Sequence, residues 1–363
     1  MSRGRRMVLA ALAAAALVLA AVPGALAARG PLPAAAFDIA PPSPPLRDAV
    51  LPAPSATASR ALRGGQAGRY PVNDGQGRTV AISVTPACEV TCNAANPQAV
   101  ANFLGNLIHG DEMSLLRVEL VAPTPEMATI CGQGALACYF SGANRMVISG
   151  DDDAAPDGAT RAFIIAHEYG HHVAQHRLNP PFEPAINYGT KRWSSFERVC
   201  QGARRGQYFP GDQGNHYFQN PGEAFAESFA FTKFPNAPVQ WAWIDSLRPR
   251  RGSFRAIRAD TLRPWAHRTR AIVRGELSGR EVLTARRVRT PLDGVLSVRL
   301  EGPRRSDFDL LLRDGAGRVV RRSQGVGSEE RVSFLICGQA RFRAVVRRAD
   351  GPGGDFKLVF RRP

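Results

Sequence analysis

The motif that constrains this chain most is His167-Glu168-Tyr169-Gly170-His171, which has the H-E-x-x-H pattern. Apolar residues on both sides of it predict a helix over residues 159–177. Residues four apart on a helix project from the same side, so His167 and His171 can bind one metal ion. Glu168 lies one position further round the helix, where its carboxylate reaches a water molecule instead of the metal. Nitrogen ligands and an open coordination position indicate catalytic Zn²⁺.

A catalytic zinc ion needs a third protein ligand. The metzincin continuation would require Gly and His where this chain has Ala174 and Arg177, so that class is excluded. Glu223 and Glu227 lie four apart on another predicted helix, over residues 221–233. We expect Glu223 to bind the metal and Glu227 to accept a hydrogen bond from a ligating histidine. Two alternatives stay open: Glu223 only caps its helix in a capping box, or Glu227 is the ligand.

These two motifs together resemble the gluzincin zinc metallopeptidases, the thermolysin-like branch of the zincins. The resemblance implies that His167, His171 and Glu223 bind zinc, that Glu168 is the general base, and that Glu227 orients a histidine. The family commonly has Asp at the position of Glu227. The likeness covers about residues 78–233 and is strong at the two motifs. Since the tetrahedral oxyanion needs a further donor, we expect His216 or Tyr217 to supply it.

The N-terminus has the layout of an export signal. Arg3, Arg5 and Arg6 precede an apolar run over residues 7–22, and residues 25–27 read Ala-Leu-Ala. This predicts a secretory signal peptide over residues 1–27, with an uncleaved membrane anchor as the alternative. No other long uncharged apolar run occurs, so a polytopic membrane protein is excluded. We expect a secreted, extracellular protein with no stable membrane insertion after cleavage.

An even number of cysteines in an oxidising compartment predicts disulfides. There are six: Cys88, Cys92, Cys131, Cys138, Cys200 and Cys337. Cys131 and Cys138 flank a short flexible loop, and we expect them to pair. Six cysteines allow 15 connectivities, so the other two bridges stay open. Paired C-x-x-C units are missing from the sequence, which disfavours a Cys-rich zinc site.

Composition and periodicity divide the rest of the chain. Residues 28–77 are rich in proline and alanine and predict an extended linker or a propeptide without regular structure. Apolar patterns then predict strands over residues 79–84, 117–122 and 145–149, and helices over residues 97–109, 159–177 and 221–233. Asp157 or Thr160 would cap the second helix. We expect an α+β fold, with a zincin-like metallopeptidase domain over residues 78–268 made of a mixed sheet and the active-site helix.

The last part of the chain has a different texture. Short apolar runs separated by turn residues predict a small all-β sandwich over residues 269–363. Residues 306–315, Cys337-Gly338 and residues 354–358 resemble the bacterial pre-peptidase C-terminal domain, a small sandwich appended to secreted peptidases. Asp307, Asp309 and Asp314 could hold Ca²⁺, but we expect turn and edge-strand carboxylates.

The basic excess is concentrated near the C-terminus. The net charge is +16, and residues 247–363 hold 28 basic against 12 acidic residues. Arginines number 44 and lysines three, a bias of composition that gives no support to nucleic-acid binding. The excess would favour contact with an anionic cell wall or matrix, with a solvated arginine-rich surface as the alternative.

The sequence as a whole predicts a secreted zinc-dependent endopeptidase that acts on protein or peptide substrates and has no nucleic-acid partner. Glu168 would remove the proton of the attacking water. The alternative is a non-catalytic secreted surface-binding protein, in which a zincin scaffold carries a basic β-sandwich as an adhesion module.

Overall fold

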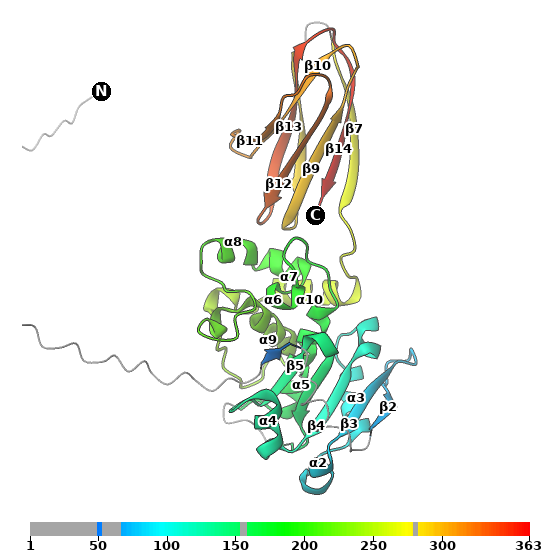
Figure 1. The fold of residues 1–363 in the computed structure, drawn as a ribbon, viewed down its shortest axis with the longest axis vertical. Helices are drawn as coiled ribbons and strands as arrows, with labels where there is room; N and C mark the ends of the chain where they lie inside the picture. Colours follow the sequence, from blue (N-terminus) through cyan, green and yellow to red (C-terminus); the bar gives the residue numbers. More distant parts are fainter. Residues whose placement is uncertain (1–48, 53–66, 153–157, 279–281) are drawn as a thin grey trace, which may run out of the picture. The chain divides into compact units, whose positions relative to one another are not determined.

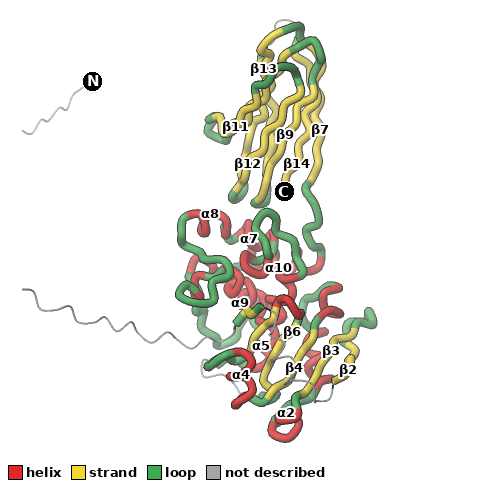
Figure 2. Tube along the Cα trace, in the orientation of Figure 1, coloured by secondary structure: helices red, strands yellow, loops and turns green. Residues whose placement is uncertain are grey.

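The computed structural model describes residues 49–52, 67–152, 158–278 and 282–363. A mixed six-stranded sheet with helices forms its first part, and two four-stranded sheets form its last part (Figures 1 and 2). This is the expected α+β class. The expected signal peptide, the Asp157 cap and most of the expected linker lie outside the described residues.

Fourteen strands occur in these ranges: β1 (Val50–Leu51), β2 (Ala67–Pro71), β3 (Thr79–Val84), β4 (Arg117–Val121), β5 (Ala137–Phe140), β6 (Arg145–Ser149), β7 (Thr269–Leu277), β8 (Leu283–Thr290), β9 (Gly294–Glu301), β10 (Asp307–Arg313), β11 (Val319–Ser323), β12 (Glu329–Ile336), β13 (Ala340–Asp350) and β14 (Gly354–Arg362). The α-helices are α2 (Pro86–Thr91), α3 (Pro97–Gly105), α4 (Ala128–Cys131), α5 (Arg161–Gln175), α6 (Ala185–Tyr188), α7 (Lys191–Phe196), α8 (Val199–Arg204), α9 (Pro221–Lys233) and α10 (Arg251–Leu262). Short irregular helices are η1 (Asp111–Leu115), η2 (Pro123–Met127), η3 (Ser141–Ala143), η4 (Tyr217–Gln219) and η5 (Asp245–Leu247).

The first sheet has the strand order β1-β5-β6-β4-β3-β2. β3, β4 and β6 run parallel, whereas β2 and β5 run antiparallel to their neighbours β3 and β6. The alternating pattern of β3 buries Val80, Ile82 and Val84 against the helices. Strands β3 and β6 have the predicted bounds, while β4 ends one residue early and α3 ends at Gly105 instead of near residue 109.

One expectation about the N-terminal segment is wrong. The range 28–77 was expected to carry no regular structure, yet it contains β1 and β2. β2 pairs with β3, and β1 pairs with β5 at the opposite edge of the sheet. Gly68 and Pro71 conceal β2 in the sequence, because both residue types are depleted in strands. Pro71 is tolerated because β2 is an edge strand, where a missing N–H leaves no ladder bond unmade.

The motif helix α5 begins and ends at specific polar contacts. The Thr160 hydroxyl accepts a hydrogen bond from the Phe163 N–H and so caps the helix, as one of the two predicted candidates. Beyond the C-terminal end, the Arg177 guanidinium donates to the Glu112 carboxylate at 2.8 Å and to the carbonyls of Asp260 and Thr261. Arg177, at the position where a metzincin would have a histidine, therefore ties α5 to η1 and α10.

The predicted all-β region consists of two four-stranded sheets, ordered β11-β10-β13-β8 and β12-β9-β14-β7. Their ladders are antiparallel throughout. Between the sheets lies a separate apolar core, to which Leu296, Leu310, Phe342 and Phe356 contribute.

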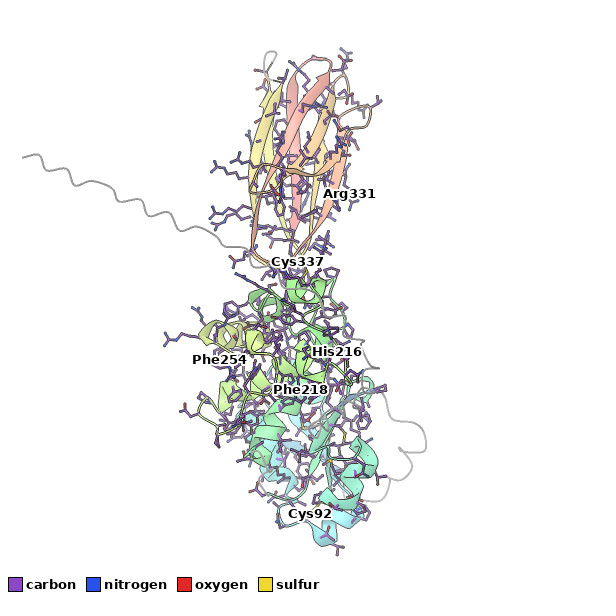
Figure 3. The ribbon with its side chains drawn as sticks, turned by 90° about the vertical axis from the view of Figure 1, so that its left-hand side faces the viewer. Cys92, His216, Phe218, Phe254, Arg331 and Cys337 are labelled. Atoms are coloured by element: carbon purple, nitrogen blue, oxygen red, sulfur yellow. A yellow bond between two sulfur atoms is a disulfide. The ribbon has the colours of Figure 1, made fainter. Side chains whose placement is uncertain are left out.

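Three disulfides are present. The expected Cys131–Cys138 bridge is confirmed, and the other two are Cys88–Cys92 and Cys200–Cys337. The last one joins α8 to the residue after β12, at the Cys337 labelled in Figure 3. Gln201 supports this link by donating to the Cys337 carbonyl. Among the described residues, no helix combines the length and apolar character needed to cross a membrane.

Removing the long-range disulfide should destabilise the protein more than removing a short-range one. The bridge Cys200–Cys337 spans 137 positions and Cys88–Cys92 spans four, so the chain-entropy model assigns them about 5 and about 2 kcal/mol. We expect the double variant C200A/C337A to lose more unfolding free energy in denaturant titrations than C88A/C92A. Equal losses would show that the long loop is already restricted in the unfolded chain.

Candidate metal centre

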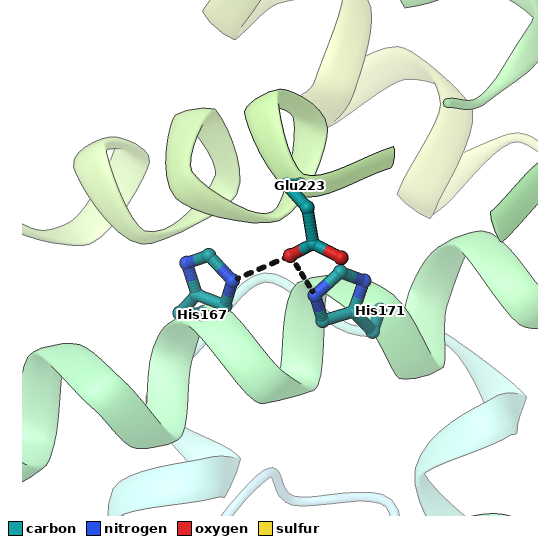
Figure 4. A group of neighbouring side chains, drawn as sticks. All are labelled: His167, His171 and Glu223. Atoms are coloured by element: carbon teal, nitrogen blue, oxygen red, sulfur yellow. Dashed lines mark hydrogen bonds and ion pairs between the residues drawn. The ribbon is translucent and has the colours of Figure 1, made fainter. Parts of the chain in front are cut away.

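Helices α5 and α9 lie side by side and carry the predicted site between them (Figure 4). Their close approach depends on Gly170, in the middle of the H-E-x-x-H motif. A Cβ added at Gly170 would lie 2.8 Å from the Cα of Ala226 on α9. A side chain there would push the helices apart, so glycine is required for the distance at which glutamates of α9 reach histidines of α5.

The structure brings His167, His171 and Glu223 together, with one ligand atom from each within 4.8 Å of the others. Glu223 Oε2 lies 3.0 Å from His171 Nε2 and 3.6 Å from His167 Nε2 (Figure 4). Ligands at about 2.0–2.1 Å in a tetrahedral zinc site are about 3.3 Å apart. The two observed distances bracket this value, so the three side chains could hold a metal ion with small adjustments.

Glu227 occupies the other side of the His167 ring. Its Oε2 lies 2.9 Å from His167 Nδ1, so Nδ1–H donates to the carboxylate and Nε2 is left with its lone pair facing Glu223. Trp243 stacks on the same ring, with centroids 5.8 Å apart and planes at 29°. A carboxylate and an indole thus hold the orientation of His167.

Glu223 faces the histidines and does not fold back to cap its helix. Asn220 caps α9 by accepting from the Gly222 N–H, while the Asn220 N–H donates to the Tyr217 carbonyl. The second carboxylate oxygen of Glu223 accepts a hydrogen bond of 2.6 Å from the Gln213 side chain. With one oxygen held by Gln213, the other is directed at the two histidines.

Glu168, the predicted base, is completely buried and lies on α5 next to His167 in the sequence. Its negative charge acts on Tyr139 of β5, whose pKa is raised first by burial and second by Glu168. The Tyr139 hydroxyl is 2.8 Å from His172 Nδ1, and His172 Nε2 donates to the Glu112 carbonyl. Burial lowers the pKa of His172 to about 3, so this ring is neutral and its Nδ1 accepts a hydrogen bond from the Tyr139 hydroxyl.

His216 and Tyr217, the predicted oxyanion donors, have different surroundings. The His216 ring is partly exposed, stacks on Phe209 at 3.7 Å and lies 3.0 Å from an Asp212 oxygen. Tyr217 is buried, and its ring lies 6.2 Å from that of Trp243. The structure therefore connects Tyr217 to His167 through Trp243, while a catalytic role for either residue stays a prediction.

The charges of this site favour a bound cation. Glu168, Glu223 and Glu227 are all at most 2% exposed. The ion-pair partners of Glu223 and Glu227 are His167 and His171, which carry no full positive charge when neutral. Burying carboxylates costs much free energy, and a divalent cation beside them would offset part of that cost. The donor set thus fits a metal ion both in geometry and in charge.

Three supporting residues were missed by the sequence analysis. Gln213 lies in the stretch 179–219, where no regular pattern was found, and Trp243 lies in a loop after α9. Tyr139 belongs to a strand that was not predicted. No local pattern marks any of them, because their roles arise from contacts with residues distant in the chain.

Comparison with known proteins places the chain in no family. No family profile matches it, and no curated protein matches it in sequence. The pre-peptidase C-terminal domain of a Bacillus anthracis collagenase is 13% identical, covers 24% of this chain and 87% of its own, and has a TM-score of 0.23. A Legionella pneumophila aminopeptidase A in complex with aspartic acid is 10% identical, covers 77% of this chain and 35% of its own, and has a TM-score of 0.24. At these TM-scores neither likeness carries an inference about activity.

Substituting each glutamate of α9 separately should show which of the two binds the metal and which only orients a histidine. We expect E223A to lose zinc binding almost entirely, because it removes one of the three converging donors. E227A should weaken zinc binding by about 10–100-fold, because it removes only the acceptor for His167 Nδ1–H. Competition titration with a chelator measures both affinities. If E223A retained wild-type affinity while E227A lost it, the ligand assignment would have to be reversed.

Gly170→Ala tests the helix approach. In a helix, Ala is normally favoured over Gly by about 1 kcal/mol. Here the added Cβ meets the backbone of α9, so we expect a net destabilisation of about 1–3 kcal/mol and weaker zinc binding. Thermal unfolding and chelator competition measure the two effects. The helix propensity of Ala alone would stabilise the variant, whereas the clash with α9 would destabilise it. A stabilised variant would therefore show that the two helices have room to separate.

Proposed function

We propose that this protein is a secreted zinc-dependent endopeptidase of the gluzincin type. The observation that carries the proposal is the convergence of His167, His171 and Glu223 on one point, with Glu168 buried on the same helix. Two histidines and a glutamate form the donor set of catalytic zinc sites that leave a coordination position open. The approach of the glutamate helix to the H-E-x-x-H helix supports the gluzincin part of the proposal.

The reaction would depend on one general base. A zinc ion at this site would polarise the scissile carbonyl and lower the pKa of a water molecule. Glu168 would take a proton from the attacking water and later deliver it to the leaving amine. Glu227 would keep His167 in the tautomer whose Nε2 lone pair faces Glu223. Tyr217 or His216 would donate a hydrogen bond to the developing oxyanion.

Two further parts of the proposal concern the chain as a whole. The three disulfides fit an oxidising compartment, and the arginine-led apolar N-terminus supports export. The all-β region agrees in class with a pre-peptidase C-terminal sandwich, which the pattern around residues 306–315 led us to expect. Residues Asp309 and Asp314 pair with Arg347 and Arg318, which supports turn and edge-strand carboxylates over a calcium site.

A non-catalytic surface-binding protein is the alternative, and the arginines of the sandwich favour it. Such a scaffold would have no use for Glu168. A buried glutamate at the general-base position of the motif supports the catalytic proposal over this alternative. Peptide hydrolysis and surface binding can occur in one chain, so hydrolysis must be tested by itself.

The decisive variant is Glu168→Gln, which preserves size and removes the base. We expect hydrolysis of casein or gelatin to fall by at least about 10²–10⁴-fold, the usual contribution of a general base. Zinc content should stay at about one ion per chain, because Glu168 is not a ligand. E276Q, on the exposed surface of β7, is the matched control and should keep full activity. Near wild-type turnover by E168Q would remove Glu168 from the mechanism.

A further inference from the structure

One face of the sandwich carries a concentrated set of arginines. It is the outer face of the sheet β11-β10-β13-β8. Five of its arginines are called here the arginine face: Arg287, Arg289, Arg313, Arg341 and Arg343. All but the half-buried Arg313 are exposed. The residues that alternate with them, such as Val288 and Phe342, point into the core.

The strand register places these arginines opposite one another. Arg341 is paired with Arg289, and Arg343 is paired with Arg287 on one side and with Arg313 on the other. Side chains directly opposite on neighbouring strands are about 4.5–5.5 Å apart at Cβ, where like charges destabilise a sheet. Two adjacent rows of like charge therefore cross β8 and β13, and the second, which contains Arg343, extends to Arg313 of β10.

The nearby carboxylates are already used by other partners. Asp314 pairs with Arg318 at 2.8 Å, and Asp309 pairs with Arg347. Across the part of the chain that the structure describes, none of the five arginines of the arginine face forms an ion pair. The Nε of Arg313 is buried and makes no hydrogen bond to any described residue. The positive charge of this face is therefore uncompensated.

The outer face of the other sheet differs, although it also carries arginines. There Lys357 pairs with Glu301 at 2.5 Å, and Arg299 pairs with Glu329 at 3.3 Å. Glu276 and Asp355 add further negative charge. Arginines are opposed on that face as well, since Arg361 is paired with Arg270 and Arg331 with Arg299. The two faces therefore differ in the carboxylates that accompany the arginines, which only the arginine face lacks as partners.

A groove coincides with the arginine face. It has a volume of about 480 Å³ and is lined by the four exposed arginines, Asp314 and Phe342. The unpaired positive charges therefore line a groove in the surface. Phe342 is only 5% exposed, so the groove offers no aromatic platform of the kind on which single-stranded nucleic acids stack their bases.

We propose that the arginine face binds a linear cell-surface polymer with one phosphodiester in each short repeat. Guanidinium groups bind phosphate oxygens through two parallel hydrogen bonds. Arginines two apart on one strand are about 6.7 Å apart, close to the length of a three-carbon diol phosphate repeat. In a polyuronate, by contrast, successive carboxylates point to alternate sides. The binding site is separate from the metal centre and does not depend on hydrolysis.

The test uses the full mature protein and fluorescently labelled poly(glycerol phosphate). We expect R287Q/R289Q/R341Q/R343Q to bind at least tenfold more weakly at 0.1 M salt. The slope of log affinity against log salt should fall by about 3, since each phosphate contact contributes about 0.7. The matched control is R270Q/R274Q/R331Q/R361Q, which removes four exposed charges from the other face, where Arg331 is labelled in Figure 3. The control should retain most of the affinity.

Each outcome bears on the proposal. Equal loss in both quadruple variants would mean that only net charge matters and would overturn it. Tighter wild-type binding to polygalacturonate or to single-stranded DNA of equal charge would also overturn it. Should the first quadruple variant fail to fold in a thermal melt, R287Q/R343Q and R289Q/R341Q replace it, and each should lose part of the affinity. Unchanged cleavage of a small peptide by all variants would show that the metal centre is intact.

Discussion

The close packing of α5 against α9 is the interaction on which the candidate metal centre depends. Gly170 allows the two backbones to approach until a side chain would no longer fit between them. This approach places the Glu223 carboxylate within 3.0 Å of the His171 ring and the Glu227 carboxylate within 2.9 Å of the His167 ring. Without a cation, burying these carboxylates close together costs free energy. The same closeness would let them and the histidines stabilise a divalent cation.

Elements from other parts of the chain hold that geometry in place. Gln213 binds one oxygen of Glu223, and Trp243 covers one face of the His167 ring. Arg177 anchors the far end of α5 through Glu112. Each of these contacts restricts a side chain that would otherwise rotate, so the ligand atoms are positioned before any metal arrives.

The sandwich adds a surface with a different chemistry. Its two outer faces share one core and both carry opposed arginines, but on the other face carboxylates such as Glu301 and Glu329 pair with the basic side chains, whereas the arginine face has no such ion pairs. The disulfide Cys200–Cys337 joins this sandwich covalently to α8 of the part that carries the candidate metal centre. If both proposals hold, a peptidase would be retained at a phosphate-rich surface and would act on proteins found there.

The sequence by itself determined the helices of the metal centre, because a helix depends on near neighbours. The histidine spacing predicted the α5 face, while Thr160 and Asn220 cap their helices through contacts within three residues. The Cys131–Cys138 bridge was predictable for the same reason, since it closes a short loop. The likeness to a known motif also indicated the pairing of His171 with Glu223 before any contact was visible.

Only the tertiary structure decided which side chains support these residues. Gln213 reaches Glu223 from an irregular loop, and β2 joins the sheet although glycine and proline conceal its pattern. The register that sets Arg343 between Arg287 and Arg313 depends on how strands pair. Such contacts join positions far apart in the chain and are fixed by packing and hydrogen bonding of the whole fold, which no local spacing encodes.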